Sequence, residues 1–184
     1  GGELVKPELA VFGGSFDPPH VGHVFLATYA LCIAGVERVL AAPTFEHAFG
    51  KPLTAFEHRL AMCTSAFAAL PAVEVSPIER ELGGTSRTLR LLHELQRRFP
   101  GHQLRLLIGS DILAESARWQ GFDEIRALAP PIVVTRGGHG DAGGPLFPQL
   151  SSTELRAQLA VGELDAQVLP WGVRAYIREH QLYA

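Results

Sequence analysis

Cysteine is scarce in this chain. Only two cysteines, Cys32 and Cys63, occur among 184 residues, and both lie in largely apolar stretches. Two such residues cannot build the disulfide framework of a small secreted protein, and they are too few for a zinc site made of cysteines. The cysteine content therefore indicates a reducing compartment, and we expect the protein in the cytoplasm.

Long apolar runs and an excess of positive charge are also absent. No stretch approaches the roughly 18 apolar residues that a membrane-spanning helix requires, and the first residues show no basic segment followed by an apolar one, as a signal peptide would. With 16 Lys and Arg against 19 Asp and Glu, the net charge is −3. A dedicated nucleic-acid binder needs a basic surface, so we expect neither a membrane nor a nucleic acid as partner.

The chain does have enough apolar material for a core. Hydrophobic residues make up 47% of it and charged residues 19%, which is typical of a folded chain. At roughly 100–200 residues per domain, the length predicts a single domain over residues 1–184. Within it, we expect a small helical part from about 151–184.

Short apolar runs alternate with longer helical patterns along the sequence. The predicted strands are 9–12, 38–42, 73–75, 104–108 and 132–135, and the predicted helices are 21–34, 55–69, 85–99, 123–128, 152–160 and 173–180. Apolar strands that alternate with helices form a parallel sheet covered on both sides, with right-handed crossovers. We therefore predict an α/β fold: a doubly wound, Rossmann-like parallel sheet of five to six strands with helices on both faces. Its ligands would bind at the carboxyl ends of the strands.

The loop after the first predicted strand carries the most informative stretch. It reads Gly13-Gly14-Ser15-Phe16-Asp17-Pro18-Pro19-His20-Val21-Gly22-His23. Two glycines let backbone N–H groups approach an anion closely. His20 and His23 stand three residues apart at a helix start, where the helix itself favours a phosphate. Gly22 between them removes a side chain where a ligand could lie close.

Other roles for these histidines remain open. A histidine near a helix start is often a cap or a surface residue. The pair could also ligate a metal, but a metal site needs a third ligand, and neither His47 nor His58 has a supporting spacing. We therefore expect no metal held by the protein alone.

The stretch resembles the signature of the HxGH nucleotidyltransferase superfamily, and specifically the nicotinate-mononucleotide adenylyltransferases. Further segments that resemble this family are Leu107-Ile108-Gly109-Ser110-Asp111, Trp119, Glu124-Ile125, Val133-Val134-Thr135-Arg136, Ser151-Ser152-Thr153-Glu154-Leu155-Arg156, Tyr176-Ile177 and Leu182-Tyr183. The resemblance implies adenylyl transfer from ATP to nicotinate mononucleotide, which forms deamido-NAD and pyrophosphate in NAD biosynthesis. It also implies Mg²⁺, carried by the substrate phosphates.

On the ATP side, the resemblance assigns His20 and His23 as the catalytic residues that hold the phosphates. Ser152 and Thr153 would cap a helix start and offer hydroxyls, and Arg156 would grip the β and γ phosphates; capping alone is the other role. Asp111 would contact ribose or cap the next helix. The full expected ATP set is Gly13, Gly14, Ser15, Phe16, His20, His23, Gly109, Asp111, Ser152, Thr153 and Arg156.

On the mononucleotide side, the expected set is Ser15, His47, Lys51, Thr85, Trp119 and Arg136. Trp119 would stack on the pyridine ring, unless it is a core residue. Thr85 is expected at a helix start whose N–H groups favour the nicotinate carboxylate. The family has an aromatic residue where this chain has Gly84. Arg136 would meet a phosphate or lie in solvent.

Three rivals compete with this interpretation. One is an enzyme of the same superfamily with another acceptor, such as nicotinamide mononucleotide, phosphopantetheine or a cytidylyl acceptor. The second is a non-catalytic nucleotide-binding regulator, and the third is a metal-binding module. The presence of His20, His23 and Arg156 together favours the enzyme.

Overall fold

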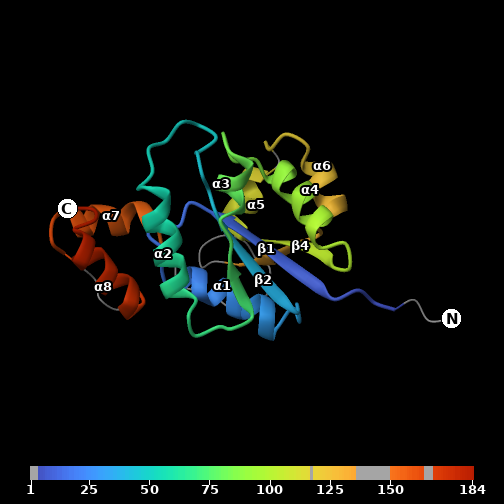
Figure 1. Ribbon diagram of the computed structural model, residues 1–184, viewed down its shortest axis with the longest axis horizontal. Helices are drawn as coiled ribbons and strands as arrows, with labels where there is room; N and C mark the ends of the chain where they lie inside the picture. The colour runs from blue at the N-terminus through green and yellow to red at the C-terminus, as the bar shows by residue number, and fades with distance from the viewer. Residues whose placement is uncertain (1–3, 117, 136–149, 164–167) are drawn as a thin grey trace.

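The computed structural model describes residues 4–116, 118–135, 150–163 and 168–184. Its centre is a five-stranded sheet in the order β3-β2-β1-β4-β5, and every neighbouring pair is parallel (Figure 1). The strands are β1 (Glu8–Gly14), β2 (Arg38–Pro43), β3 (Val73–Val75), β4 (Gln103–Gly109) and β5 (Pro131–Val134). The predicted doubly wound parallel sheet is confirmed.

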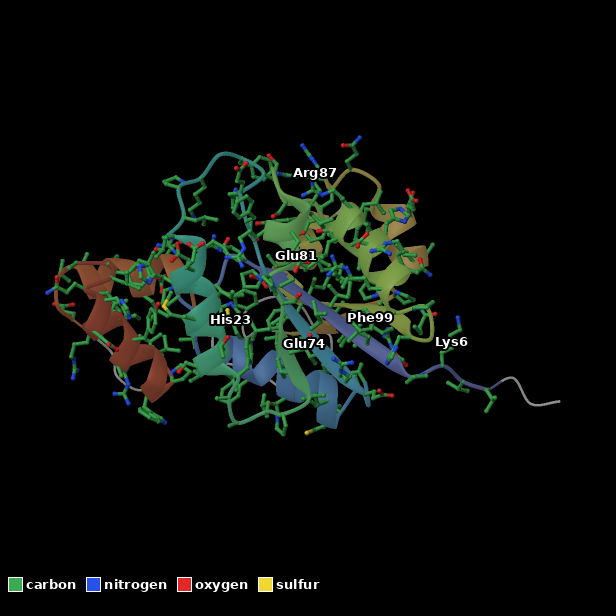
Figure 2. The ribbon with its side chains drawn as sticks, viewed as in Figure 1. Lys6, His23, Glu74, Glu81, Arg87 and Phe99 are labelled. Atoms are coloured by element: carbon green, nitrogen blue, oxygen red, sulfur yellow. The ribbon has the colours of Figure 1, made fainter. Side chains whose placement is uncertain are left out.

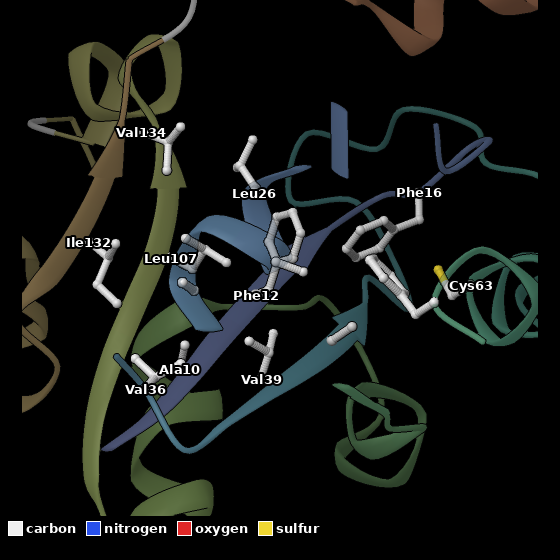
Figure 3. Packing of buried hydrophobic residues seen from close by; sticks show 14 residues of the cluster. Ala10, Phe12, Phe16, Leu26, Val36, Val39, Cys63, Leu107, Ile132 and Val134 are labelled. Atoms are coloured by element: carbon white, nitrogen blue, oxygen red, sulfur yellow. The ribbon is translucent and has the colours of Figure 1, made fainter. Parts of the chain in front are cut away.

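Alternate residues of β1 face two separate cores. Ala10 and Phe12 belong to a cluster with α1 (Val21–Cys32) and part of α2 (Phe56–Ala66), which Figure 3 shows. Leu9 and Val11 belong to a second cluster on the other face. There the sheet packs against α3 (Ile78–Leu82), α4 (Thr88–Arg98) and α6 (Phe122–Leu128). Because both faces are covered, the strand reads as a continuous apolar run.

Two helices were not predicted, and one begins later than predicted. α3 and α5 (Ser110–Ser116) occupy stretches that lack a long apolar period. α4 begins at Thr88 and not at Thr85. Gly83 and Gly84 have φ of 70° and 64°, a left-handed conformation that glycine adopts readily and that interrupts a helix.

A third apolar cluster joins the C-terminal helices to α2. α7 (Ser152–Ala160) and α8 (Trp171–His180) contribute Leu155, Val173 and Ile177, which pack with Met62. A side chain at residue 172 would overlap the Ser65 hydroxyl, so Gly172 allows α8 to approach α2. Within the described ranges, no helix is both long and apolar enough to cross a membrane.

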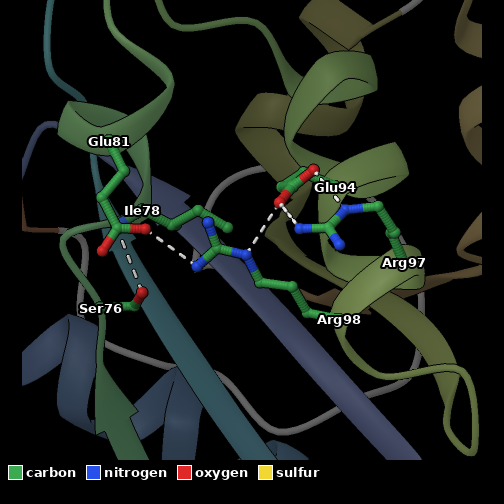
Figure 4. A network of polar contacts seen from close by, with 6 residues as sticks. All are labelled: Ser76, Ile78, Glu81, Glu94, Arg97 and Arg98. Atoms are coloured by element: carbon green, nitrogen blue, oxygen red, sulfur yellow. Dashed lines mark hydrogen bonds and ion pairs between the residues drawn. The ribbon is translucent and has the colours of Figure 1, made fainter.

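Charged side chains support the helical face that carries α3 and α4. Glu94 accepts hydrogen bonds from Arg97 and Arg98, and Arg98 also pairs with Glu81 at 2.9 Å (Figure 4). Hydrogen bonds from the two guanidinium groups lower the pKa of Glu94 to about 2. The ion pairs lie at the surface, where the arginines are exposed and Glu94 is partly covered, so we expect them to add little stability.

Candidate functional site

The two histidines together cap the N-terminus of α1. His20 is the N-cap, and its Nδ1 accepts a hydrogen bond from the amide of Gly22 at 3.0 Å. His23 Nδ1 accepts from the amide of His20, also at 3.0 Å. This arrangement is a capping box made of two imidazoles, and it uses N–H groups that the first helical turn leaves without helix partners. Figure 2 labels His23 at this end of α1.

The capping bonds fix the tautomer of both rings. A nitrogen that accepts from an amide carries no proton, so in each ring the proton lies on Nε2. The rings of His20 and His23 stack with centroids 3.9 Å apart and planes 28° apart. In this tautomer the Nε2–H groups are the ring donors, and donors of this kind suit the oxygens of a phosphate chain. His20 is 2% exposed.

Gly22 makes room for His20. A Cβ at position 22 would lie 2.7 Å from Cε1 and 2.9 Å from Nδ1 of His20. The imidazole of His20 therefore lies where a side chain at position 22 would begin. The spacing of the motif is a packing requirement of the histidine itself.

Phe16 supports the histidines from the core. Its φ is 49°, its side chain is 2% exposed, and its ring lies 4.9 Å from that of His23. The ring of Phe16 is therefore a core side chain. Gly13 is exposed, and a Cβ there would meet nothing within 4 Å in the described structure. Packing against the described residues therefore does not require this glycine.

Asp17 is a buried junction that the sequence reasoning missed. Its carboxylate is 3% exposed and accepts hydrogen bonds from the amide of Thr54, at 3.1 Å, and from the hydroxyl of Tyr183. Its backbone carbonyl accepts from Arg156 at 2.6 Å. One residue thus joins the loop before His20 to three distant segments.

Arg59 is a second missed residue, on α2. It is 1% exposed and donates to the carbonyls of Thr54, Ser15 and Thr44 at 2.7, 3.0 and 2.6 Å. Burial lowers the pKa of its guanidinium, against the effect of the nearby Asp17 carboxylate. A signal existed, because Arg59 interrupts the apolar face of a helix, where a charge needs several partners.

The start of α7 meets the histidine loop. The N-cap is Ser151, whose hydroxyl accepts from Glu154 at 3.5 Å, so the expectation that Ser152 and Thr153 form the cap was wrong. Ser152 instead donates its hydroxyl to the carbonyl of Pro18 at 2.9 Å. Arg156 bonds the hydroxyl of Thr153 at 3.2 Å as well as the Asp17 carbonyl.

The loop after β2 lies beside the segment that precedes α4. Glu46 and Thr85 form a parallel bridge, and Ser86 donates its amide to Glu46 at 3.0 Å. The bridge places the loop that contains His47 beside the segment that contains Thr85. Lys51 is exposed further along the first of these loops. Because α4 begins at Thr88, Thr85 does not lie at a helix start, and that expectation was wrong.

A buried carboxylate lies under this second loop. Glu79 is 3% exposed, takes a hydrogen bond from Ser86, and has a pKa raised above its usual value by burial. Its Oε1 has no hydrogen-bond partner among the described residues. Arg90 fixes the same loop by donating to the carbonyls of Gly83 and Thr85 at 2.8 and 3.0 Å.

The remaining predicted residues follow β4 and β5. Gly109 ends β4, and Asp111 lies within the first turn of α5 and is not the cap of a later helix. Trp119 is half-buried against the core of the α4 face, with its ring edge-on to Phe122 at 6.4 Å. Arg136 lies outside the described residues.

The chain matches known proteins along nearly its whole length. The cytidylyltransferase-like family matches residues 11–158. Probable nicotinate-nucleotide adenylyltransferases of Anaeromyxobacter sp. strain K and of Myxococcus xanthus strain DK1622 are 46% and 40% identical to it. The alignments cover 96% of this chain in both cases, and 96% and 94% of the respective relatives.

Solved structures share the fold. The Plasmodium falciparum nicotinic acid mononucleotide adenylyltransferase, complexed with NaAD, superposes with a TM-score of 0.80 over 96% of this chain and 97% of that one, at 19% identity. A putative nicotinate-nucleotide adenylyltransferase from Vibrio parahaemolyticus superposes with a TM-score of 0.76, at 20% identity, over 96% and 95% of the two chains.

Proposed function

Because this chain belongs to the nicotinate-nucleotide adenylyltransferases within the cytidylyltransferase-like family, we propose that it transfers the adenylyl group of ATP to nicotinate mononucleotide. The products are deamido-NAD and pyrophosphate, in NAD biosynthesis. The observation that carries the proposal is the stacked pair His20 and His23, with both Nδ1 atoms engaged by backbone amides.

The chemistry needs no nucleophilic side chain. A phosphate oxygen of the mononucleotide forms a bond to the α-phosphorus of ATP, while the bond from that phosphorus to the bridging oxygen breaks and pyrophosphate leaves. The attacking oxygen already carries negative charge, so catalysis consists of positioning and charge stabilisation. In this proposal, the Nε2–H groups of His20 and His23 stabilise charge on the oxygens between the phosphates.

The start of α7 supplies the second set of phosphate contacts. Its N-terminal N–H groups and the cation of Arg156 lie beside residues 17 and 18 of the histidine loop. A helix N-terminus with an arginine one turn on favours an anion. We assign the β and γ phosphates of ATP to this position, together with backbone groups of Gly13, Gly14 and Ser15.

The mononucleotide would lie along the loops after β2 and before α4. The Glu46–Thr85 bridge supports this placement because it joins the loop of His47 to Thr85. Trp119, half-buried on the same face of the sheet as α4, would offer its ring to the pyridine. Ser15, Lys51 and Arg136 remain predicted contacts for the phosphate of this substrate.

Magnesium would enter with the nucleotide. The described residues contain no group of three or more His, Cys, Asp or Glu side chains that could hold a metal ion. The donors at the site are imidazole, hydroxyl and guanidinium groups, which suit phosphate oxygens better than they suit Mg²⁺. We therefore treat Mg²⁺ as part of the ATP substrate.

The exposed thiol of Cys32 is free, which supports a cytoplasmic location.

Pyrophosphate release tests the function. The purified protein is incubated with Mg²⁺, ATP and one acceptor at a time: nicotinate mononucleotide, nicotinamide mononucleotide or phosphopantetheine. We expect the largest kcat/KM with nicotinate mononucleotide and a product with the mass of deamido-NAD. A larger value with another acceptor would assign that substrate instead, and no release with any of them would favour a nucleotide-binding regulator.

A further inference from the structure

A tyrosine from the far end of the chain reaches the histidine loop. The hydroxyl of Tyr183 donates to the buried Asp17, across 166 positions in the sequence. Burial, and donation to Asp17, raise the pKa of Tyr183 well above its usual value. The phenol therefore stays protonated, and stays a donor, throughout the neutral and alkaline range.

The backbone after α8 bends sharply to make this contact. Gln181 and Tyr183 have φ of 53° and 64°, so two non-glycine residues within three positions adopt the left-handed conformation. Such residues are uncommon, and they persist where the surrounding contacts enforce them. α8 is already anchored to α2 by Val173 and Ile177, so its attachment does not depend on the strained turn.

Asp17 connects Tyr183 to the segment that carries the histidines. It stands three residues before His20, in the segment that leads from β1 to the cap of α1. The Nδ1 atoms of both histidines accept hydrogen bonds from backbone amides at the start of α1. The position of this backbone therefore sets the direction of both Nε2–H groups. A shift of the loop would therefore re-aim both donors, and small misplacements of donors reduce rates strongly.

We propose that Tyr183 is a positioning residue for the adenylyl transfer proposed above, on which this inference rests: its hydrogen bond to Asp17 holds the histidine loop in the geometry that aims His20 and His23. Tyr183 need not touch either substrate. Arg156 and Ser152 hold the backbone of the same loop, whereas Tyr183 holds the side chain of Asp17.

The test compares Tyr183→Phe with Tyr176→Phe. The first variant removes only the hydroxyl that Asp17 accepts from. The second removes a hydroxyl on α8 that lies 2.9 Å from Nδ1 of His58, away from the loop. For Tyr183→Phe we expect kcat to fall about tenfold, since one hydrogen bond to a charged group is lost, with KM for the mononucleotide within about twofold of wild type. Tyr176→Phe should keep the wild-type kcat.

A second readout does not depend on activity. Backbone amide exchange of residues 15–17, 20–23 and 54 should be about fivefold faster in Tyr183→Phe than in Tyr176→Phe, while the strands exchange as in wild type. If Tyr183 only stabilises the fold, Tyr183→Phe would have a lower melting temperature but an unchanged kcat. Amide exchange in the loop would then not differ from exchange in the rest of the protein. That result would overturn the proposal. If wild type itself shows no turnover, the proposed function fails, and the exchange comparison still decides the role of Tyr183.

Discussion

The Nδ1 atom of His23 accepts a hydrogen bond from the amide of His20, and its ring stacks on the ring of the same residue. His23 therefore caps the helix through Nδ1, whereas the donor role proposed for it would use Nε2. These two roles use different nitrogens, so they can be separated by substitution.

For His23→Gln we expect a near-normal melting temperature but a turnover lower by about 10²–10³, the usual cost of one donor to the transition state. Glutamine at this position is a standard capping-box partner, so the cap persists while the imidazole donor is lost. His23→Ala should show the same loss of turnover and lose a further 0.5–2 kcal/mol or so of stability through the missing cap. Steady-state kinetics and thermal melting check both, and turnover within about threefold of wild type in His23→Gln would remove His23 from the catalytic set.

Gly22→Ala should lower both stability and turnover. Alanine is the better helix former by about 1 kcal/mol, yet its Cβ would overlap the ring of His20. Displacing that ring breaks the cap, so we expect a net loss of about 1–2 kcal/mol and almost no turnover. Gly101→Ala is the matched control, because a Cβ there meets nothing within 4 Å. A Gly22→Ala variant as active and stable as Gly101→Ala would contradict this account.

Arg156→Ala should raise KM for ATP more than KM for the mononucleotide. The cation is assigned to the β and γ phosphates, which only ATP carries. Because Arg156 also bonds the Asp17 carbonyl, we expect some loss of kcat as well. Initial rates over a grid of both substrate concentrations give the two KM values. An equal or larger rise for the mononucleotide would reassign Arg156 to that substrate.

Arg59→Met should destabilise the protein by about 2–4 kcal/mol, because it removes the donor to the carbonyls of Ser15, Thr44 and Thr54 in two loops. Urea unfolding measures the change. Arg80→Met is the comparison, since Arg80 is an exposed arginine whose ion pair with Glu57 spans 3.4 Å, and such pairs contribute under about 1 kcal/mol. Equal losses of unfolding free energy in the two variants would show that the three hydrogen bonds of Arg59 stabilise the protein no more than one exposed ion pair does.

Glu79→Gln should gain stability over wild type as the pH rises. The folded state raises the pKa of Glu79 above its ordinary value of 4.5, so the folded protein binds this proton more tightly than the unfolded chain does. Wild type then loses stability as the pH rises from 4.5 through the folded-state pKa, and Gln cannot titrate. Unfolding free energies from pH 4 to pH 8 should show a widening difference between Glu79→Gln and wild type. A difference that stays constant across this range would refute the assignment.

Periodicity was sufficient to predict the sheet. The apolar runs of β1 and β4 have no other explanation than burial on both sides, and the helical patterns between them fix the crossovers. The stretch at residues 83–85 shows where this reasoning stops. Positive φ at two glycines and a bridge to a distant loop decide where α4 begins, and neither has a periodic signal.

The site could be predicted only as far as the motif itself. The loop from Gly13 to His23 identifies which residues gather at the end of β1. It does not say that His20 fills the space beside Gly22, because that depends on the ring's own direction. Asp17, Arg59 and Tyr183 escaped prediction because their partners lie in segments far away in the sequence.

The position of β1 in the middle of the sheet has a consequence during biosynthesis. Its residue Leu9 pairs with Arg38 on one side and with Leu104 on the other. A nascent chain that ends before β4 would therefore expose an unpaired edge of its central strand, which is a hazard for aggregation. Ser152 and Arg156, which hold the loop ahead of His20, emerge later still. The growing chain thus acquires its sheet first, and the contacts of Ser152 and Arg156 with this loop form only afterwards.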